Sequence, residues 1–346
     1  MLQSPGSCRV TTAEHLAVTA PSESAFADLE ALFAATPLSE IDRDALRQWQ
    51  PGSSLWGRLK PLIARRAGAR LCWAEVDGHR LNYWDTGASD KPVLVLIHGF
   101  GSSKENWSFL SELLHRHYRV LAPDLPGFGN SSFRVDCDYK VTSQAQRIAQ
   151  WLKDLKVDSA FVAGSSMGGA IAAQLAAGHP NLVSGLCLMN AAGAPATRVS
   201  MLEVGILAGS NYLVANRPTE AQRVFQICFH SRKRMLGALF AFLMGTEMAQ
   251  RAIVNHAIFS DLVHSLSEVN ACLPQVNSPT LVLWGDSDRV LDVSCVDAFL
   301  AAIPQAKAMV FPETGHLPMV ERPKDTATVL RAFFSAPHGI VNTENV

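Results

Sequence analysis

The chain has 346 residues, of which 48% are hydrophobic and 18% charged, an ordinary globular composition that excludes a mainly disordered protein. Its 30 basic and 31 acidic residues leave a formal net charge of −1, so no overall positive field favours nucleic-acid binding. The longest strongly apolar stretch, Met235 to Met244, has about half of the roughly 20 residues that a membrane-spanning helix needs. The length fits about two domains, or one large α/β domain with insertions.

The start of the chain and its cysteines bear on the compartment. The first twenty residues have neither the basic start nor the continuous apolar run of a secretory signal. The seven cysteines are scattered, and no two have the close spacing of a zinc or redox motif. We therefore expect reduced thiols in a cytoplasmic protein, although a chain whose signal had been removed would share these features.

Residues 1–70 are predicted to form a helical N-terminal extension with an uneven charge distribution. Seven acidic residues and a single base, Arg43, lie between Glu14 and Asp44. Residues 45–74, in contrast, hold six basic residues and no acidic one. Such a basic stretch is a candidate for contact with an anionic surface, and it is also what a solvated helix face looks like.

Two helical segments are expected within this extension. Ser39-Glu40-Ile41-Asp42 resembles a capping box that begins a short helix running through Trp49, and Pro51-Gly52 ends it. Residues 55–69 mix apolar and basic side chains, as helices that lie on a membrane surface do. The segment is expected either to give peripheral membrane contact through residues 47–70 or to dock on the main domain with its basic face in solvent.

From Leu71 onward, short apolar runs rich in β-forming residues alternate with helical patterns. Asp77-Gly78 between the first two runs is a strong hairpin signal. The later runs are continuously apolar, which indicates a mostly parallel, doubly wound sheet covered on both faces. We predict strands at Leu71–Val76, His79–Trp84, Val93–Ile97, Tyr118–Ala122, Ala160–Ala163, Leu186–Met189, Thr280–Trp284 and Ala308–Phe311, and helices at Trp107–Arg116, Ser143–Leu155, Gly169–Ala177, Val293–Ala301 and Lys324–Phe334.

About ninety residues between Met189 and Thr280 show helical periodicity and no convincing strand. A structureless loop of that length is rare in a compact domain, so we expect an inserted helical lid at residues 194–273. The core then comprises residues 71–193 and 274–336, followed by a flexible tail at 337–346. Seven residues of this insertion are too apolar for a solvated face and should either line a channel for an apolar group, contact lipid or pack the inserted helices together: Met235, Leu236, Leu239, Phe240, Phe242, Leu243 and Met244.

The pentapeptide Gly164-Ser165-Ser166-Met167-Gly168 is the most informative motif. It follows a predicted strand and precedes a helix of small residues, so a sharp turn would project the side chain of Ser166 outward as a nucleophile. The flanking glycines are needed where the chain passes too close for side chains. The backbone N–H of Met167, at the start of the helix, would then face a developing oxyanion. The alternative is a mere Gly/Ser-rich turn.

A serine hydroxyl is a weak nucleophile and needs a base, which in turn needs an orienting carboxylate. His316 lies in a loop after the last predicted strand, from which it can reach the carboxyl edge of a parallel sheet. Its rival, His98, directly follows a buried strand and is expected to order the adjacent loop.

Three aspartates are candidates for the orienting carboxylate. Asp286 and Asp288 both follow the strand predicted at Thr280–Trp284, and Asp292 is a weaker third candidate. Spacing alone does not choose among them. Each would come after Ser166 and before His316 in the chain.

Taken in order, the motifs resemble those of the α/β-hydrolase fold superfamily over about residues 72–336. The matching segments are His98-Gly99-Phe100-Gly101, Asp124-Leu125-Pro126-Gly127-Phe128-Gly129, Gly164–Gly168, Trp284-Gly285-Asp286-Ser287-Asp288 and Gly315-His316-Leu317-Pro318. This resemblance implies Ser166, Asp288 and His316 as the catalytic residues. It also implies an oxyanion hole formed by the N–H groups of Phe100 and Met167, and neither a metal nor an organic cofactor.

Within that superfamily, residues 164–169, 190–193 and 284–294 are similar to monoacylglycerol lipases and related bacterial lipases. The resemblance implies a serine hydrolase that cleaves carboxylic esters, lipid or small-molecule, through an acyl-enzyme, and no nucleic-acid partner. One alternative is a carbon–carbon bond hydrolase of the meta-cleavage-product type, which keeps the same triad. Another is a non-catalytic binding protein on the same fold.

Overall fold

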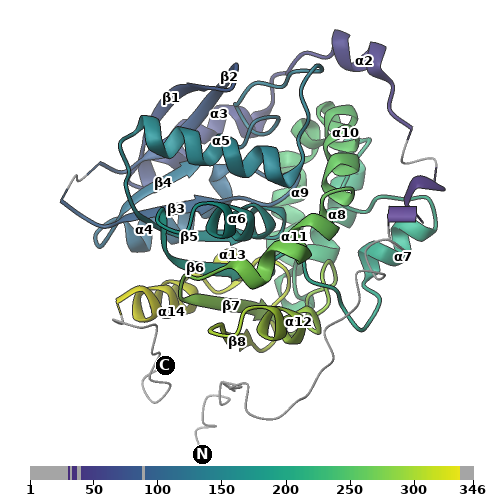
Figure 1. Ribbon diagram of the computed structural model, residues 1–346. Coiled ribbons are helices and arrows are strands. Elements are labelled where there is room, and N and C mark those ends of the chain that lie inside the picture. Colours follow the sequence, from purple (N-terminus) through teal and green to yellow (C-terminus); the bar gives the residue numbers. More distant parts are fainter. Residues whose placement is uncertain (1–29, 32, 37–39, 88–89, 336–346) are drawn as a thin grey trace, which may run out of the picture.

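The computed structural model describes residues 30–335 except 32, 37–39 and 88–89 (Figure 1). An eight-stranded sheet, ordered β1-β2-β4-β3-β5-β6-β7-β8, forms its centre. The β1–β2 and β2–β4 pairs are antiparallel and the other five are parallel, which confirms the predicted mostly parallel sheet with its hairpin at one edge. The strands are β1 Arg70–Val76, β2 His79–Asp85, β3 Val93–Ile97, β4 Arg119–Pro123, β5 Ala160–Ser165, β6 Val183–Met189, β7 Thr280–Gly285 and β8 Lys307–Phe311.

The strand order reverses direction at β3 and β5. The chain passes from β3 outward to β4, whereas from β5 it proceeds the opposite way through β6, β7 and β8. Loops that leave the carboxyl ends of β3 and β5 therefore diverge and leave a crevice between them, the usual place for a ligand in such sheets.

The helices cover both faces of the sheet because right-handed crossovers in opposite directions lie on opposite faces. Helices α5 and α6 pack beside each other on one face, with α12 further along, and α14 packs against α4 on the other (Figure 1). Their bounds are α4 Ser108–Leu114, preceded by a 3₁₀ turn η2 Lys104–Trp107, α5 Val141–Asp154, α6 Met167–Gly178, α12 Cys295–Ala302, α13 Pro318–Glu321 and α14 Pro323–Ser335.

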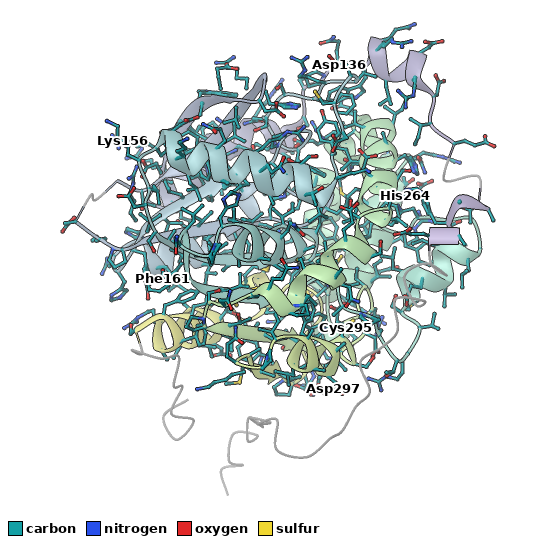
Figure 2. The ribbon with its side chains drawn as sticks, in the orientation of Figure 1. Asp136, Lys156, Phe161, His264, Cys295 and Asp297 are labelled. Carbon is teal, nitrogen blue, oxygen red and sulfur yellow. The ribbon has the colours of Figure 1, made fainter. Side chains whose placement is uncertain are left out.

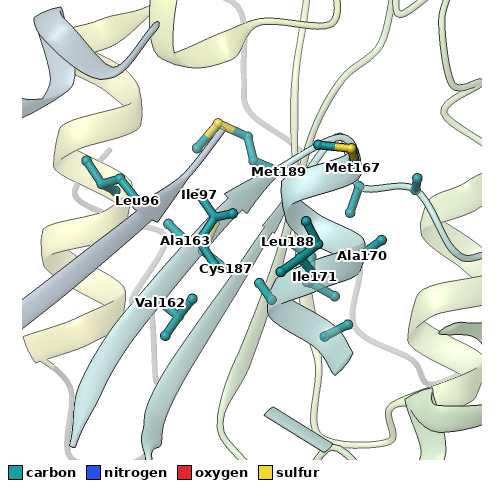
Figure 3. Close-up of a cluster of buried hydrophobic side chains, with 14 of the residues drawn as sticks. Leu96, Ile97, Val162, Ala163, Met167, Ala170, Ile171, Cys187, Leu188 and Met189 are labelled. Atoms are coloured by element: carbon teal, nitrogen blue, oxygen red, sulfur yellow. The ribbon is translucent and has the colours of Figure 1, made fainter. Parts of the chain in front are cut away.

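The core beneath the crevice is formed by the central strands and α6. Figure 3 shows Leu188 of β6 beside Ile171 of α6, with Ile97 of β3 and Ala163 of β5 on the adjacent strands, and all four are fully buried. The small residues of α6, such as Ala170, let this helix lie close to the sheet. The apolar runs in the sequence thus become the support on which the turn after β5 rests.

Helices fill the segment between β6 and β7, and no strand interrupts them. None of the helices in the described part of the chain is both long and apolar enough to cross a membrane. The last of these helices, α11, packs on α6 of the core. The elements are α7 Met201–Leu207, η3 Pro218–Glu220, α8 Ala221–Cys228, η4 Ser231–Lys233, α9 Arg234–Gln250, α10 Ala252–Val263, α11 Leu266–Cys272 and η5 Leu273–Gln275.

The seven apolar residues expected to avoid a solvated face lie in different environments. Met235 and Phe242 are 89% and 77% exposed, whereas the ring of Phe240 stacks on Phe225 and Phe229 of the α8 region. Part of this set therefore packs the lid and part faces solvent. The remaining four, Leu236, Leu239, Leu243 and Met244, are half-buried or exposed, and three of them line a cavity described below.

The helix predicted to begin at Ser39 begins later than the sequence indicates. Helix α2 spans Arg43–Gln48, and its N-cap is Asp42, whose carboxylate accepts bonds from two backbone N–H groups. The expected cap at Ser39 is outside the described residues. An aspartate accepts from the first-turn N–H groups as well as a serine does, so the later residue of the tetrapeptide serves as the cap.

Helix α3, Leu55–Arg66, docks on the lid helix α9. The ammonium of Lys60 is buried and donates to Glu247 at 2.7 Å, and Ser54 donates to the same carboxylate at 2.8 Å. The Trp56 ring meets Phe240 edge to face. The extension is therefore attached to the lid, and one of the six basic residues in the stretch 45–74 is an internal ion-pair partner.

A buried charge cluster lies between η2 and the loop after β4. Asp124 accepts from the Lys104 ammonium at 2.7 Å and from the Lys104 backbone N–H at 2.8 Å, and Glu105 lies 3.1 Å from the same ammonium. Burial, the largest single influence, would raise the pKa of Asp124, but the neighbouring charges, that of Lys104 first among them, and a backbone hydrogen bond together lower that pKa. One cation thus balances two buried carboxylates close to the crevice.

Replacing Lys104 by Met should lower the free energy of unfolding by about 3 to 5 kcal/mol, because two buried carboxylates lose their counter-charge. Urea-induced unfolding followed by circular dichroism measures the change. The control is Lys153→Met on the exposed side of α5, which should change stability by less than about 0.5 kcal/mol. Equal, small effects of both substitutions would contradict the role given to Lys104.

Candidate active site

Ser166 occupies a strained turn between β5 and α6. Its φ of 56° and ψ of −122° lie outside the regions that residues with a side chain normally adopt. Its N–H donates to the carbonyl of Met189 at 3.0 Å, and its carbonyl accepts from Ala192 at 3.0 Å. Backbone bonds to the chain after β6 therefore hold the strained residue in place.

The glycines around Ser166 are required by close backbone contacts. A Cβ atom on Gly164 would lie 2.1 Å from the carbonyl oxygen of Gly168, and one on Gly168 would lie 2.2 Å from the carbonyl oxygen of Ile97. A Cβ atom on Gly99 would lie 3.1 Å from that of Ser166. The loop after β3 thus passes directly against the turn after β5.

His316 and Asp288 form a buried pair at the same edge of the sheet. The Nδ1 atom of His316 lies 2.7 Å from Oδ2 of Asp288, and the side chains are almost inaccessible. Asp288 also accepts from the side-chain amide of Asn190 at 2.7 Å and from the backbone N–H groups of Val290 and Leu291. A carboxylate with these partners is fixed in place and can hold the imidazole with Nδ1 protonated.

The structure separates the three aspartates that spacing left open. Asp286 is exposed and bonded to the neighbouring Ser287, and Asp292 pairs with Arg198 at 3.0 Å. Asp288 alone among the three contacts His316.

Ser166 and His316 line one cavity, although no hydrogen bond joins their side chains in the part of the chain that the structure describes. Serine–histidine bonds are often long in unliganded enzymes and shorten when substrate binds. The segments that follow the carboxyl ends of β5, β7 and β8 therefore bring Ser166, Asp288 and His316 to one region of the sheet edge.

His98 is fully buried and belongs to the loop after β3. Its Nε2 accepts from the N–H of Leu125 at 3.0 Å, so Nδ1 carries the proton and donates to the carbonyl of Gly99 at 2.8 Å. Burial lowers the pKa of His98 to about 4, which keeps the ring neutral near pH 7. Both ring nitrogens are thus occupied in ordering loops.

Two backbone N–H groups beside Ser166 are free to bind an anion. Met167 is the first residue of α6, so its N–H has no acceptor within the helix. The N–H of Phe100 likewise donates to no other residue in the described part of the chain. The close approach of Gly99 to Ser166 places this second donor next to the nucleophile turn.

The lid fixes the loop that carries His316. The N–H of His316 donates to the carbonyl of Cys228 at 2.7 Å, at the end of α8. The buried carboxylate of Glu321 accepts from the N–H of Gly315 and from that of His230, both at 2.9 Å. The position of the imidazole therefore depends on the insertion as well as on the sheet.

Sequence reasoning gave no individual role to Asn190 and Glu321. Asn190 sits at the carboxyl end of β6 with a φ of 45°, which asparagine tolerates better than most residues. The sequence did offer one signal for Asn190: an asparagine directly follows a buried strand, at the sheet edge that carries Ser166. Glu321 becomes identifiable only when the fold brings it back to the histidine loop.

Three cavities meet around this site. The α7 cavity adjoins Ser166 on one side and is lined by Phe100, Ala196, Leu202, Ile206, Phe259, Val263, Leu266 and Cys295, among others. The His316 cavity adjoins Ser166 on the other side and is lined by Ser102, Asn106, Val224, Cys228, Met248 and His316. The α3–α9 cavity lies beyond it, between the extension and the lid, and is lined by Trp56, Ile63, Phe109, Phe229, Leu236, Leu239 and Phe240.

Cys295, labelled in Figure 2 at the start of α12, is buried and lines the α7 cavity. Burial raises the pKa of its thiol far above the ordinary range, so the thiol is an apolar wall. The surroundings of Ser166 on this side are therefore almost entirely hydrocarbon, with Asp292 and Glu203 at the edge. No group of three or more potential metal ligands occurs among the described residues.

Comparison with known proteins gives consistent matches. The model of the alpha/beta hydrolase family matches residues 94–329. The chain is 30% identical to Lipase 3 of Moraxella sp. (strain TA144) over 74% of this chain and 81% of that protein. It is 26% identical to monoacylglycerol lipase ABHD6 of Mus musculus over 81% and 86% of the two chains. A solved structure of a membrane phospholipase A, described as a bacterial virulence factor, is 35% identical to this chain. The match covers 81% of this chain and 90% of that one, with a TM-score of 0.74.

Changing Asn190 to Asp should slow the reaction of Ser166 with a fluorophosphonate probe by at least about tenfold. The variant loses the amide donor and places a second carboxylate against Asp288, which disturbs the orientation of His316. Labelling rates of the folded variants, measured by mass spectrometry, test this. Asn277→Asp on the exposed surface should label at the wild-type rate, and an equally fast Asn190→Asp would contradict the assignment.

Proposed function

The chain belongs to the alpha/beta hydrolase family, and we propose that it is a serine hydrolase of carboxylic esters that works through an acyl-enzyme. The observation that carries the proposal is the buried His316–Asp288 pair at 2.7 Å, of which His316 lines the same cavity as the strained Ser166. This arrangement supplies a nucleophile, a base and an orienting carboxylate.

In the proposed mechanism, Ser166 attacks the ester carbonyl while Nε2 of His316 takes the hydroxyl proton. Asp288 keeps the imidazole in the correct tautomer and stabilises the imidazolium. The N–H groups of Phe100 and Met167 bind the oxyanion of the tetrahedral intermediate. His316 then delivers its proton to the leaving alcohol, which departs and leaves an acyl-serine.

Water completes the proposed cycle. It attacks the acyl-serine with His316 as base, and collapse of the second tetrahedral intermediate releases the carboxylic acid and returns the proton to Ser166. The bonds that hold Asp288 and the His316 loop support this role, because the imidazole must keep its orientation through both halves of the reaction.

A lipid ester is the proposed substrate class. The α7 cavity beside Ser166 has an apolar lining suited to an acyl chain. The names of the relatives support this class, since they are a lipase, a monoacylglycerol lipase and a phospholipase A. Hydrolysis of carbon–carbon bonds is the second candidate function, because such a hydrolase would use the same three residues.

We also propose contact with an anionic lipid surface through α3 and α9. These helices lie together, and each exposes an apolar stripe, Leu55 and Leu62 on α3 and Met235, Leu239 and Phe242 on α9. Exposed basic side chains flank both stripes, including Arg58, Arg65, Lys233 and Arg234. Apolar side chains beside cations are what an interfacial helix presents to a membrane.

Ser166→Ala should abolish hydrolysis of p-nitrophenyl esters from C2 to C16, with a loss of at least about 10⁴-fold in kcat and an unchanged circular dichroism spectrum. Ser165→Ala is the matched neighbour and should retain most of the activity. The wild-type optimum should lie at C8 or longer because the α7 cavity is apolar. Near-wild-type hydrolysis by folded Ser166→Ala would exclude the mechanism. Inactivity of the wild type on every ester would favour the carbon–carbon hydrolase.

Substituting Asp for both Leu62 and Phe242 should reduce co-sedimentation with phosphatidylglycerol-containing vesicles at least about fivefold, because both side chains are exposed and apolar. Deleting residues 1–70 is a poorer test, since it would also remove the buried side chains of Trp56 and Lys60. Lys153→Glu on α5 makes the same net charge change and should bind normally. Equal binding by all three proteins would exclude this surface.

A further inference from the structure

The cavity that His316 lines holds the leaving alcohol, if the proposed mechanism is correct. His316 must reach the leaving oxygen to protonate it, and it lines the His316 cavity but not the α7 cavity. Ser166 lines both cavities, so a bound ester spans them with its carbonyl carbon between. The acyl chain then lies in the α7 cavity and the alcohol in the His316 cavity.

The His316 cavity continues into the α3–α9 cavity. The two share five lining residues, namely Ser102, Asn106, Phe225, Met244 and Leu317. The outer cavity is the larger, at about 250 Å³ against about 70 Å³. A leaving alcohol too long for the His316 cavity can therefore extend into the α3–α9 cavity.

Most of the residues that line the outer cavity are apolar. Its walls come mainly from Trp56 and Ile63 of α3 and from Leu236, Leu239 and Phe240 of α9. Leu239 is 52% exposed, so this wall reaches the molecular surface on the apolar stripe of α9. Free glycerol, the alcohol of a monoacylglycerol, would leave this apolar space without a complementary group.

Six polar residues line the outer cavity: Ser102 and Asn106 also line the His316 cavity, whereas Arg66, Ser103, Glu105 and Ser108 line the outer cavity alone. The side chains of Ser102 and Asn106 are half-buried at the shared boundary, and neither donates to or accepts from another residue in the part of the chain that the structure describes. They are available to a short polar segment that lies between the ester and an alkyl chain.

We propose that the leaving alcohol is itself a lipid, with a polar linker of about glycerol size followed by an alkyl chain in the α3–α9 cavity. The substrate class is thus a two-chain glycerolipid. One wall of this site is α3, which lies outside the segment that the family model matches. This inference rests on the proposed ester hydrolysis and adds the identity of the alcohol part.

The test compares 1-octanoylglycerol with 1-octanoyl-2-O-octylglycerol, which has the same single scissile ester and an ether-linked second chain. Both are presented at equal mole fraction in the same detergent micelles. Wild-type kcat/KM should be at least about tenfold higher for the two-chain compound, since burial of each methylene favours binding. Equal values for the two compounds would overturn the proposal.

Leu236→Trp places a large side chain in the outer cavity and should bring that ratio to about one by lowering kcat/KM for the two-chain compound, because Leu236 lines the outer cavity but not the His316 cavity. Ala196→Trp in the α7 cavity is the matched control and should lower both activities while keeping the ratio. A folded Leu236→Trp enzyme that keeps the wild-type ratio would contradict the assignment of the chain to the outer cavity.

A binding measurement separates this proposal from the ester hydrolysis itself. In Ser166→Ala, a 2-O-alkylglycerol with a doxyl group on its chain should quench the fluorescence of Trp56, and Trp56→Phe should remove most of the quenching. Failure to hydrolyse either ester would contradict the proposed function. The quenching of Trp56 would still test whether the outer cavity binds a lipid alcohol. The same quenching with and without Trp56 would overturn the lipid-alcohol site.

Discussion

The close approach of two loops is the constraint on which the site depends. The turn after β5 and the loop after β3 pass so near each other that a Cβ atom on Gly168 would lie 2.2 Å from the carbonyl oxygen of Ile97. That proximity puts the free N–H of Phe100 beside Ser166, and it holds Ser166 at a φ of 56°, a conformation that costs about 1 to 3 kcal/mol. The packed strands and α6 beneath the turn are what make such a conformation persist.

Buried carboxylates order the loops around this turn. Asp124, Asp288 and Glu321 each accept at least two backbone N–H groups from irregular segments. Buried polar groups must be satisfied, so each carboxylate fixes the loops that satisfy it. Asp124 forms an ion pair with Lys104 and has a structural role. Asp288 contacts His316 and is the carboxylate that orients the proposed base.

The lid and the N-terminal extension act together on the site. The lid supplies the carbonyl of Cys228 and the N–H of His230 that hold the His316 loop, directly and through Glu321. The extension fixes the lid through the buried Lys60–Glu247 pair. A segment without any motif of the family thus forms one wall of a cavity that leads to Ser166.

The sequence by itself determined the sheet, the turn at Ser166 and the candidate histidine, because strand hydrophobicity and glycine placement are local properties of the chain. It left three aspartates open, began the helix that precedes Trp49 too early, and treated Lys60 as one of a run of basic residues. Tertiary structure decided the first and the last of these points: it brought Asp288 rather than Asp286 to His316, and it buried Lys60 against Glu247. The physical reason is that contacts between residues 28 and 187 positions apart follow from the packing of whole elements, which no local pattern records.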